Sequence, residues 1–369
     1  MTAASSAGAS PAAPVSPAPM PPAPAPAPAG QPAGDHPVPD LAAEQARAVA
    51  LINQADEICL ACHIRPDADA LGSMLALARA LHAPGRRPQR ITASFGDEPF
   101  EVPEILRFLP GLDLLSPPGS YPARPEIMIT FDAGSIDRLG LLAGPAAQAG
   151  HLIVVDHHAS NTRFGRVNLV DPGAAATAVL VLDLIGALGG ELTQDVALGL
   201  YAGLVTDTGS FKFSTTTPEV HQVAARLLST GIEPGAVARQ LWDRAPFGYL
   251  GLLSGVLARA VLETDAAGGH GLVWTSLSAA DRAAHGLSLD AVEPVIDVVR
   301  RTEEADVAVV LKQSDDGLWQ VSARSRGTVD VGRACARLGG GGHRNAAGFT
   351  GSTSAEETMA RLRGLLAEG

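Results

Sequence analysis

The sequence predicts an α/β protein with a doubly wound, mostly parallel sheet and a smaller α/β domain after it. Short apolar runs alternate with segments of helical periodicity between residues 40 and 245, which is the pattern of a parallel sheet covered by helices. A second set of strand and helix signals starts near residue 261. Acidic residues and histidines follow several of the apolar runs, at the position where open α/β sheets bind their ligands.

The chain begins with a segment of different composition. Residues 1–39 hold 12 of the 28 prolines and contain no Lys or Arg. Such a segment cannot bury a core, so we expect a disordered tail, partly in the polyproline II conformation. It lacks the basic and apolar regions of a signal peptide, and no run in the chain reaches the roughly 18 apolar residues of a membrane helix. We therefore expect a cytoplasmic protein.

The first domain is expected to span residues 40–245. Its apolar runs predict strands at residues 58–62, 90–95, 126–131, 151–155 and 166–170. Its helical periodicity predicts helices at residues 41–53, 70–81, 103–108, 174–188, 194–208, 218–229 and 235–243. A linker helix is expected over residues 246–260.

The second domain is expected to span residues 261–369. We expect strands at residues 271–276, 306–312 and 318–323, and helices at residues 279–284, 289–301, 331–338 and 356–366. Strands again alternate with helices, so this unit is also predicted to be α/β.

The stretch between the first predicted strand and its helix is the first candidate for a chemical site. His63, Asp67 and Asp69 lie in this turn. Two carboxylates and an imidazole so close together would repel one another unless a cation neutralised the acids, so the turn suits a divalent metal ion. The alternative is a capping turn, with Asp69 at the N-terminus of the following helix.

Other segments of the first domain supply further groups of the same kind. Two more predicted strands end in acids or histidines, and one predicted helix ends in an acid: the residues are Asp132, Asp156, His157, His158 and Asp207. Parallel strands meet at one edge of a sheet, so these side chains are expected to form one shell around a metal.

The three cysteines are not expected to form a disulfide framework. Cys59 and Cys62 have the spacing of a redox or zinc pair, but both lie in one predicted strand. Residues three apart on a strand point to opposite faces of the sheet. We therefore expect Cys59 and Cys62, and also Cys335, to be core residues.

The second domain combines a local positive charge with four successive glycines. Residues 322–344 contain five arginines and one acid. For Arg333 and Arg337 we expect an exposed helix face. Arg324, Ser325 and His343, with the glycines at 339–342, are expected to form a phosphate cradle, because glycine backbones approach an anion closely. A flexible hinge is the alternative interpretation of the glycines.

These motifs resemble the DHH phosphoesterase family, and within it the DHHA1-bearing branch of nanoRNase and 3′-phosphoadenosine 5′-phosphate (pAp) phosphatase-like enzymes. The resemblance covers residues 41–366 and rests on five motifs: His63-x-x-Pro-Asp67-x-Asp69, Asp132 with Arg138-x-Gly, Asp156-His157-His158, Asp207, and Gly-Gly-Gly-His343. It implies two metal ions, usually Mn²⁺ with Mg²⁺ or Co²⁺ as alternatives, in the cleft between the domains. It also implies hydrolysis of short oligonucleotides (nano-RNA), linear dinucleotides or pAp by a metal-activated water.

The resemblance also assigns a role to each residue of the metal site. His63 and Asp67 would hold one ion, and Asp69 and His157 the other. Asp132 would bridge the two ions.

The remaining motif residues receive their roles in the same way. Asp207 would complete the metal site. His158 would contact the phosphate or protonate the leaving oxygen, and Asp156 would orient a ligating histidine. The substrate contacts implied are Arg138, His158, Arg324, Ser325, Gly341, Gly342 and His343.

Three other functions stay open at this point, together with a homodimeric state. An inorganic pyrophosphatase would share the first domain. A single-strand exonuclease would act on longer nucleic acid, although the net charge of −12 argues against electrostatic coating of long strands. A non-catalytic nucleotide-binding module would be expected to lack a ligand residue, and none of the motif residues is missing.

Removal of residues 1–39 should leave the thermal midpoint and any activity of the chain essentially unchanged, because this segment has too little apolar content to pack. Thermal melts of the full and the shortened chain test this. A midpoint lowered by several degrees would show that the segment contributes to the folded core.

Overall fold

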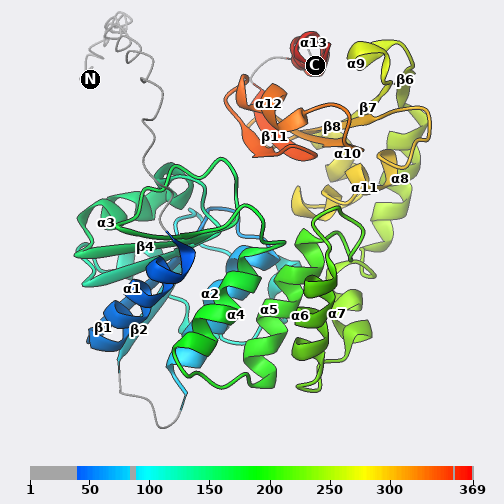
Figure 1. Cartoon of the computed structure of the whole chain (residues 1–369). Helices are drawn as coiled ribbons and strands as arrows, with labels where there is room; N and C mark the ends of the chain where they lie inside the picture. Colours follow the sequence, from blue (N-terminus) through cyan, green and yellow to red (C-terminus); the bar gives the residue numbers. More distant parts are fainter. Residues whose placement is uncertain (1–39, 84–88, 352–353, 368–369) are drawn as a thin grey trace, which may run out of the picture. The chain divides into compact units, whose positions relative to one another are not determined.

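The structure is a computed structural model that describes residues 40–83, 89–351 and 354–367. The first of its sheets is parallel and has five strands. Its strands have the order β2-β1-β3-β4-β5, and every pair is parallel (Figure 1). The strands are β1 (Glu57–Cys62), β2 (Arg90–Phe95), β3 (Ile127–Phe131), β4 (His151–Asp156) and β5 (Val167–Val170). All five predicted strands are confirmed. The predicted tail at residues 1–39 lies outside the described residues.

Helices and short 3₁₀ segments accompany the parallel sheet. The helices are α1 (Leu41–Gln54), α2 (Ala68–Leu81), α3 (Ala143–Gln148), α4 (Thr177–Ala187), α5 (Gln194–Asp207), α6 (Pro218–Leu228) and α7 (Pro234–Leu241). The 3₁₀ segments are Glu104–Leu106, Leu112–Leu114, Pro118–Ser120 and Ile136–Leu142. The helix predicted at residues 103–108 is therefore a single 3₁₀ turn, and the predicted helix at 174–188 begins three residues later. We refer to residues 40–245 as the parallel-sheet half.

The two faces of this sheet have separate cores. Leu60 and Cys62 of β1 pack in a cluster that includes residues of α2, α4 and α5. Cys59 and Ala61 belong to a second cluster with Leu142 and residues of α3. Cys59 and Cys62 are both buried and free, on opposite faces, as the sequence predicts.

The helix α2 begins earlier than its apolar pattern suggests. It starts at Ala68, and its N-cap is Asp67, whose carboxylate accepts a hydrogen bond of 2.9 Å from the amide of Ala70. The capping turn is therefore present: Asp67 is the cap, and Asp69 lies in the first helical turn. Capping leaves the second oxygen of Asp67 available to other groups.

The second sheet is mixed, with six strands in the order β10-β11-β9-β8-β7-β6. These are β6 (Val261–Glu263), β7 (Leu272–Leu277), β8 (Val307–Gln313), β9 (Trp319–Ser325), β10 (Gly341–His343) and β11 (Ala346–Gly351). β7 and β8 are parallel, and the other neighbouring pairs are antiparallel. The sequence predicts β7, β8 and β9 and misses the other three strands.

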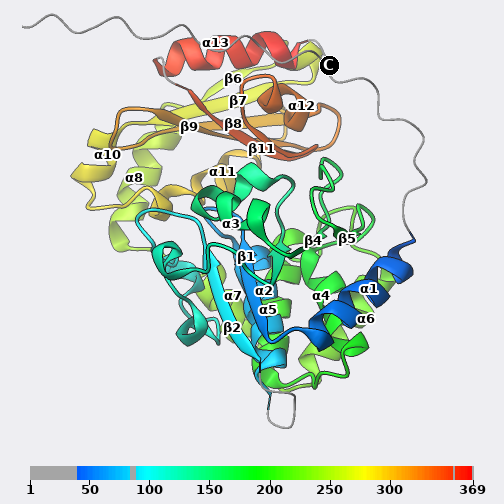
Figure 2. The ribbon, with the colours of Figure 1, turned by 90° about the vertical axis from the view of Figure 1, so that its left-hand side faces the viewer.

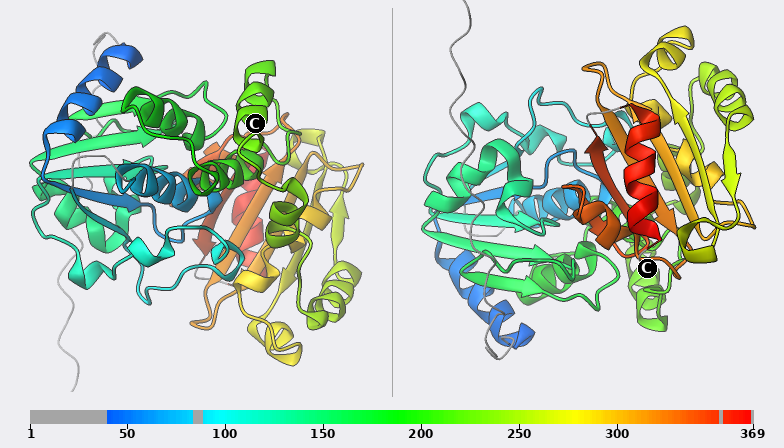
Figure 3. Two further views of the ribbon diagram at one scale, coloured as in Figure 1. Left: turned by 90° about the horizontal axis from the view of Figure 1, so that it is seen from below. Right: turned by 90° about the horizontal axis from the view of Figure 1, so that it is seen from above.

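Helices pack on both faces of the mixed sheet. They are α8 (Phe247–Ala258), α9 (Ala266–Gly269), α10 (Ala279–Ala284), α11 (Val295–Val299), α12 (Val331–Ala336) and α13 (Ala355–Leu366), with a 3₁₀ segment at Asp290–Val292. Residues of α12 and α13 pack in one core cluster, and residues of α8 and α11 in another. Figures 2 and 3 show α13 covering one face of this sheet. We call residues 261–369 the mixed-sheet half.

Two predicted elements of the mixed-sheet half differ from the structure. The helix expected at residues 289–301 is interrupted before Val295, where Pro294 cannot continue a regular helix with its missing amide proton. The glycines expected as a loop contribute to β10, which pairs with β11 as a hairpin. Arg333 and Arg337 are exposed, as predicted. Among the described residues, no helix is both long enough and apolar enough to cross a membrane.

Close contact between α2 and α5 depends on two glycines. A Cβ atom at Gly199 would lie 2.7 Å from the carbonyl oxygen of Gly72, so the two backbones approach at van der Waals distance. This contact fixes α5, which ends at Asp207, against α2, which carries Asp69.

Gly199→Ala should therefore lower the free energy of unfolding by about 1–3 kcal/mol through overpacking. The matched control is Gly186→Ala in α4, where a Cβ atom would meet nothing within 4 Å. The control should leave stability unchanged or raise it by about 0.5 kcal/mol, because alanine favours a helix over glycine. Urea unfolding measures both. Equal effects would contradict the close α2–α5 contact.

Candidate metal centre

The chemical residues of the parallel-sheet half meet at the carboxyl edge of its sheet. Cys62 is in register with Phe131, and Phe131 with Val155. The residues that follow these three strand positions therefore lie next to one another, and they are His63, Asp132 and Asp156. Asp69 reaches the same edge from α2, His157 follows β4, and Asp207 ends α5.

The six predicted metal ligands form two groups that share one residue. In the first group, Nε2 of His63 lies 3.7 Å from Asp67 Oδ2 and 3.5 Å from Asp132 Oδ2. In the second, Nε2 of His157 lies 3.5 Å from Asp132 Oδ1. Each oxygen of Asp132 thus faces a different histidine.

The second group contains two further carboxylates. Nε2 of His157 lies 4.0 Å from Asp69 Oδ2 and 3.1 Å from Asp207 Oδ2. Ligand atoms of His63, Asp67 and Asp132, and likewise of Asp69, Asp132 and His157, lie within 4.8 Å of one another. The division of the ligands into two sets around Asp132 is the one that the resemblance implies.

The backbone of Asp132 adopts an uncommon conformation that aims its carboxylate between the two groups. Its φ is 56°, in the left-handed region that non-glycine residues rarely occupy. Its amide donates a hydrogen bond of 3.0 Å to the carbonyl of Val155. The hydroxyl of Thr177 donates to Asp132 Oδ1 at 2.9 Å. Such a conformation persists where the surrounding structure holds it, often at a functional site.

The amino end of α4 holds the carboxylate of Asp69. The amides of Thr177 and Ala178 donate to its two oxygens at 2.6 Å and 2.9 Å, and the hydroxyl of Ser73 contributes a bond of 3.2 Å. The sequence analysis missed Thr177. A polar residue inside an otherwise apolar segment was the available signal, but only the tertiary fold shows that it faces Asp69 and Asp132.

The electrostatics of the centre show an excess of buried negative charge. Burial alone would lower the pKa of His63 and of His157, but the surrounding carboxylates raise each to about 10. Burial raises the pKa of Asp207 to about 6, and burial with the charges of Asp207 and Asp132 raises that of Asp69. Protonation of these groups therefore stands in for a cation.

The donor set fits divalent cations. Oxygen and imidazole nitrogen atoms without a thiolate suit Mn²⁺ and Mg²⁺, and also Co²⁺ or Zn²⁺. The Nε2 atom of His157 is buried and makes no hydrogen bond, although three carboxylates surround it. A metal ligand atom has these surroundings.

Asp156 contacts the ring of His158, whereas we expected it to orient a histidine that binds metal. Its Oδ1 atom lies 2.7 Å from Nδ1 of His158, whereas it contacts His157 through the backbone amide at 2.9 Å. Asn161, which the sequence analysis missed, donates to Asp156 Oδ2 at 2.6 Å. The ring of His157 instead has Nδ1 3.3 Å from the carbonyl of Ala174. Asp156 therefore orients His158, and despite the opposing effect of burial it raises the pKa of that residue.

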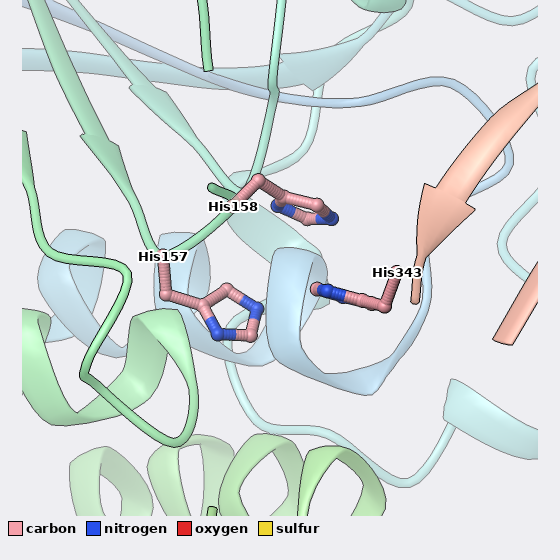
Figure 4. Close-up of side chains that lie close together, drawn as sticks. All are labelled: His157, His158 and His343. Atoms are coloured by element: carbon pink, nitrogen blue, oxygen red, sulfur yellow. The ribbon is translucent and has the colours of Figure 1, made fainter. Parts of the chain in front are cut away.

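The glycine motif of the mixed-sheet half reaches the same histidines. The ring of His343 stacks on that of His158, with centroids 4.4 Å apart and planes at 15°, and its centroid is 5.2 Å from that of His157 (Figure 4). Burial, followed by the nearby charges of His158 and His157, lowers the pKa of His343 to about 4. His343 is thus neutral near pH 7 and has a ring nitrogen to offer as an acceptor or ligand.

Two arginines predicted as substrate contacts lie in different places relative to this centre. Nη2 of Arg138 is 3.3 Å from Nδ1 of His63. Arg324 of β9 pairs with Ala346, which pairs with His343, so Arg324 and His343 occupy one row on one face of the sheet. Ser325 points to the other face, and its hydroxyl donates to Asp306 at 2.8 Å. The structure therefore does not bring Ser325 to this site.

Two of the four glycines differ in what the structure requires of them. Gly342 has φ +137°, and a Cβ atom there would lie 2.4 Å from the carbonyl oxygen of Ala346, so the β10–β11 hairpin requires a glycine. At Gly341 a Cβ atom would meet nothing within 4 Å, so packing does not explain this glycine. An open backbone beside His343 leaves room for a ligand to approach.

Comparisons with known proteins agree with this centre. Family models match the chain over residues 57–204, as the DHH family N-terminal domain, and over residues 277–368, as the DHHA1 domain. The bifunctional oligoribonuclease and PAP phosphatase NrnA of Thermus thermophilus is 38% identical over 309 residues, which are 83% of this chain and 88% of the relative. The chain belongs to the DHH family. As a DHH family phosphoesterase it is a hydrolase.

Two other proteins are also similar to this DHH protein. A probable bifunctional oligoribonuclease and PAP phosphatase NrnA of Streptococcus mutans is 28% identical, over 84% of this chain and 94% of the relative. The crystal structure of an exopolyphosphatase-related protein from Bacteroides fragilis has a TM-score of 0.78 and covers 89% of this chain and 96% of its own. At 23% identity, that likeness shows a shared fold.

Binding of Mn²⁺ at pH 7 should release about two protons per chain, because His63 and His157 have pKa values of about 10 without metal and must be neutral to bind it. The apparent affinity for Mn²⁺ should therefore rise with pH. Calorimetric titrations in two buffers with different ionisation enthalpies count the protons. His157→Gln should release about one proton fewer, and binding without proton release would contradict the protonated state of both rings.

Proposed function

We propose that this DHH protein uses two divalent cations to hydrolyse phosphoester bonds in short oligonucleotides, linear dinucleotides, pAp or several of these. The observation that carries the proposal is Asp132, whose two oxygens face His63 and His157 in separate ligand groups. The relatives named oligoribonuclease and PAP phosphatase support this choice of substrates. Mn²⁺ is the proposed metal, and Mg²⁺ or Co²⁺ would suit the same donors.

The proposed roles of the metal ligands follow the two groups. His63 and Asp67 would hold one ion, Asp69 and His157 would hold the other, and Asp132 would contribute to both. Two bound cations would supply a nucleophilic water at neutral pH and would neutralise the charge of the attacked phosphate.

Asp207 lies beside His157 in the second group and completes the proposed ligand set. The amides at the start of α4 keep both oxygens of Asp69 in place, so this ligand needs little reorganisation when a cation binds.

Proton transfer to the leaving oxygen is proposed for His158. The carboxylate of Asp156 lies 2.7 Å from Nδ1 of this ring and favours its protonated form. A protonated imidazole next to the reacting phosphate donates either a hydrogen bond to a phosphate oxygen or its proton to the departing group. Asp156 is proposed to keep the ring oriented for this transfer.

The mixed-sheet half is proposed to bind the part of the substrate that does not react. Arg324, His343 and the backbone of Gly341 and Gly342 would contact a terminal phosphate or the far nucleotide, and Arg138 would contact the substrate from the parallel-sheet half. Lys312 of β8, which no sequence motif indicated, lies beside these residues. Its ammonium group donates a hydrogen bond of 2.9 Å to the hydroxyl of Ser322 on β9 and pairs with Glu293.

The domain limits are proposed as residues 40–245 for catalysis, 246–260 for the linker helix and 261–369 for substrate binding. The cytoplasmic location and a homodimer stay predictions from the sequence.

Hydrolysis of a dinucleotide and of pAp by the full chain tests the proposal directly. Activity with Mn²⁺ should disappear on chelation and return when Mn²⁺ is restored. Asp132→Ala should lose more activity than replacement of any other single ligand, because it removes an oxygen from both groups. If pyrophosphate or long single strands are hydrolysed faster than the dinucleotide and pAp, the proposed substrate class is wrong. Full activity in the presence of chelator would contradict the metal mechanism.

Arg324→Ala should weaken binding of a nucleotide substrate by about 2 kcal/mol, the value of a charge-assisted hydrogen bond, and nearly spare a small artificial phosphodiester that cannot reach the mixed-sheet half. His343→Ala should show the same selectivity. The ratio of the two rates is the measurement, and Arg333→Ala, an exposed arginine of the same half, is the control. Equal losses on both substrates would show that these residues belong to the structure or to the chemical step.

A further inference from the structure

The loop that follows Asp207 has an unusual backbone. Three successive residues occupy the left-handed region: Gly209 with φ 57°, Ser210 with φ 59° and Phe211 with φ 63°. Glycine adopts this conformation freely, but serine and especially phenylalanine do so at a cost. The conformation is therefore one that the rest of the loop must hold in place.

Hydrogen bonds to the end of α5 hold this loop. The amide of Ser210 donates to the carbonyl of Val205 at 2.7 Å, and that of Phe211 to the hydroxyl of Thr208 at 3.1 Å. The amide of Phe213 donates to the carbonyl of Thr208 at 3.0 Å. The loop is thus tied to the residue directly after the proposed metal ligand Asp207.

This loop conformation determines the position of the aromatic ring of Phe213. The ring of Phe213 lies directly over Gly209, where a Cβ atom would come within 2.5 Å of it. Phe211 turns the other way and stacks on His221, with centroids 5.1 Å apart. Phe213 keeps 37% of its surface exposed, although it lies six residues from a metal ligand in a site rich in charge.

A guanidinium group of the mixed-sheet half faces this ring. The Cζ atom of Arg300, the residue that follows α11, lies 5.4 Å from the centroid of Phe213. The charge of Arg300 is among the causes that lower the pKa of Arg324, after burial, so the two arginines are near each other. Nη1 of Arg300 also lies 3.6 Å from Oδ1 of Asp297.

We propose that Phe213 and Arg300 form a stacking site for the nucleobase of the substrate. This inference rests on the proposed nucleotide hydrolysis. It assigns a binding site to the base, which the proposed phosphate contacts do not recognise. Every base has a flat π face, and aromatic rings and guanidinium planes bind such faces with little dependence on sequence. Phe213 lies six residues after the proposed metal ligand Asp207, and the charge of Arg300 acts on Arg324, so we assign to this pair the base of a nucleotide whose phosphate is held by these groups.

The same contact has one other interpretation. Phe213 and Arg300 belong to different halves of the chain, so the pair could join the halves without touching the substrate. A base site predicts a loss confined to substrates that have a base. A contact between the halves predicts equal losses on every substrate that needs both halves.

The test compares a dinucleotide with its abasic analogue, in the full chain with Mn²⁺. Phe213→Leu should raise KM about tenfold for the dinucleotide and leave the abasic analogue unchanged, because it removes the ring but keeps an apolar side chain. Arg300→Gln should act in the same direction. Phe247→Leu is the matched control, since Phe247 is 90% exposed in α8, and it should change neither KM.

Fluorescence of a Phe213→Trp variant provides a readout that does not depend on turnover. A phosphorothioate dinucleotide that resists hydrolysis should quench the new indole, whereas inorganic phosphate should not. Equal KM changes for both substrates, no KM change, or absence of quenching would overturn the base site. If the parent chain hydrolyses no nucleotide at all, the proposed function fails instead, and quenching alone then decides whether a base binds here.

Discussion

Repulsion among the buried carboxylates around Asp132 is the main constraint on the arrangement of this centre. Asp69 and Asp132 are buried, Asp207 has a pKa raised to about 6, and the two nearby histidines must carry protons to balance the charge. Bringing such acids together is costly unless cations or hydrogen bonds compensate. Backbone amides, the hydroxyl of Thr177 and the cap of α2 provide part of this compensation, and a pair of divalent cations would supply the remainder.

The two halves of the chain divide the chemistry between them. The parallel-sheet half contributes the proposed metal ligands, because its aligned strands end together at one edge. The mixed-sheet half contributes His343, neutral near pH 7, and Arg324, which lies in the same row of the sheet. The stacking of His343 on His158 links the residue proposed to move a proton to the residues proposed to bind the substrate. All the proposed metal ligands thus come from the parallel-sheet half, whereas the proposed substrate contacts come from both halves.

Much of this organisation could be predicted from local patterns. Apolar runs ending in Asp132 or in Asp156-His157-His158 identify parallel strands and their ligands, since period and position are properties of the sequence itself. Contacts between distant segments could not be predicted in this way. The hydrogen bonds of Thr177 to Asp69 and Asp132 join residues 108 and 45 positions apart. The glycines before His343 gave no strand signal because their β10 pairing depends on the packing of Gly340 and Gly342 against β11.

The central claim is that one carboxylate serves two cation sites. The most direct test is the number of Mn²⁺ ions bound per chain, measured by metal analysis after equilibrium dialysis, in the parent chain and in Asp132→Asn. We expect two ions in the parent, and a large loss of affinity at both sites in the variant, because one oxygen of Asp132 faces His63 and the other faces His157. A single ion in the parent, or two ions bound with unchanged affinity by the variant, would contradict it.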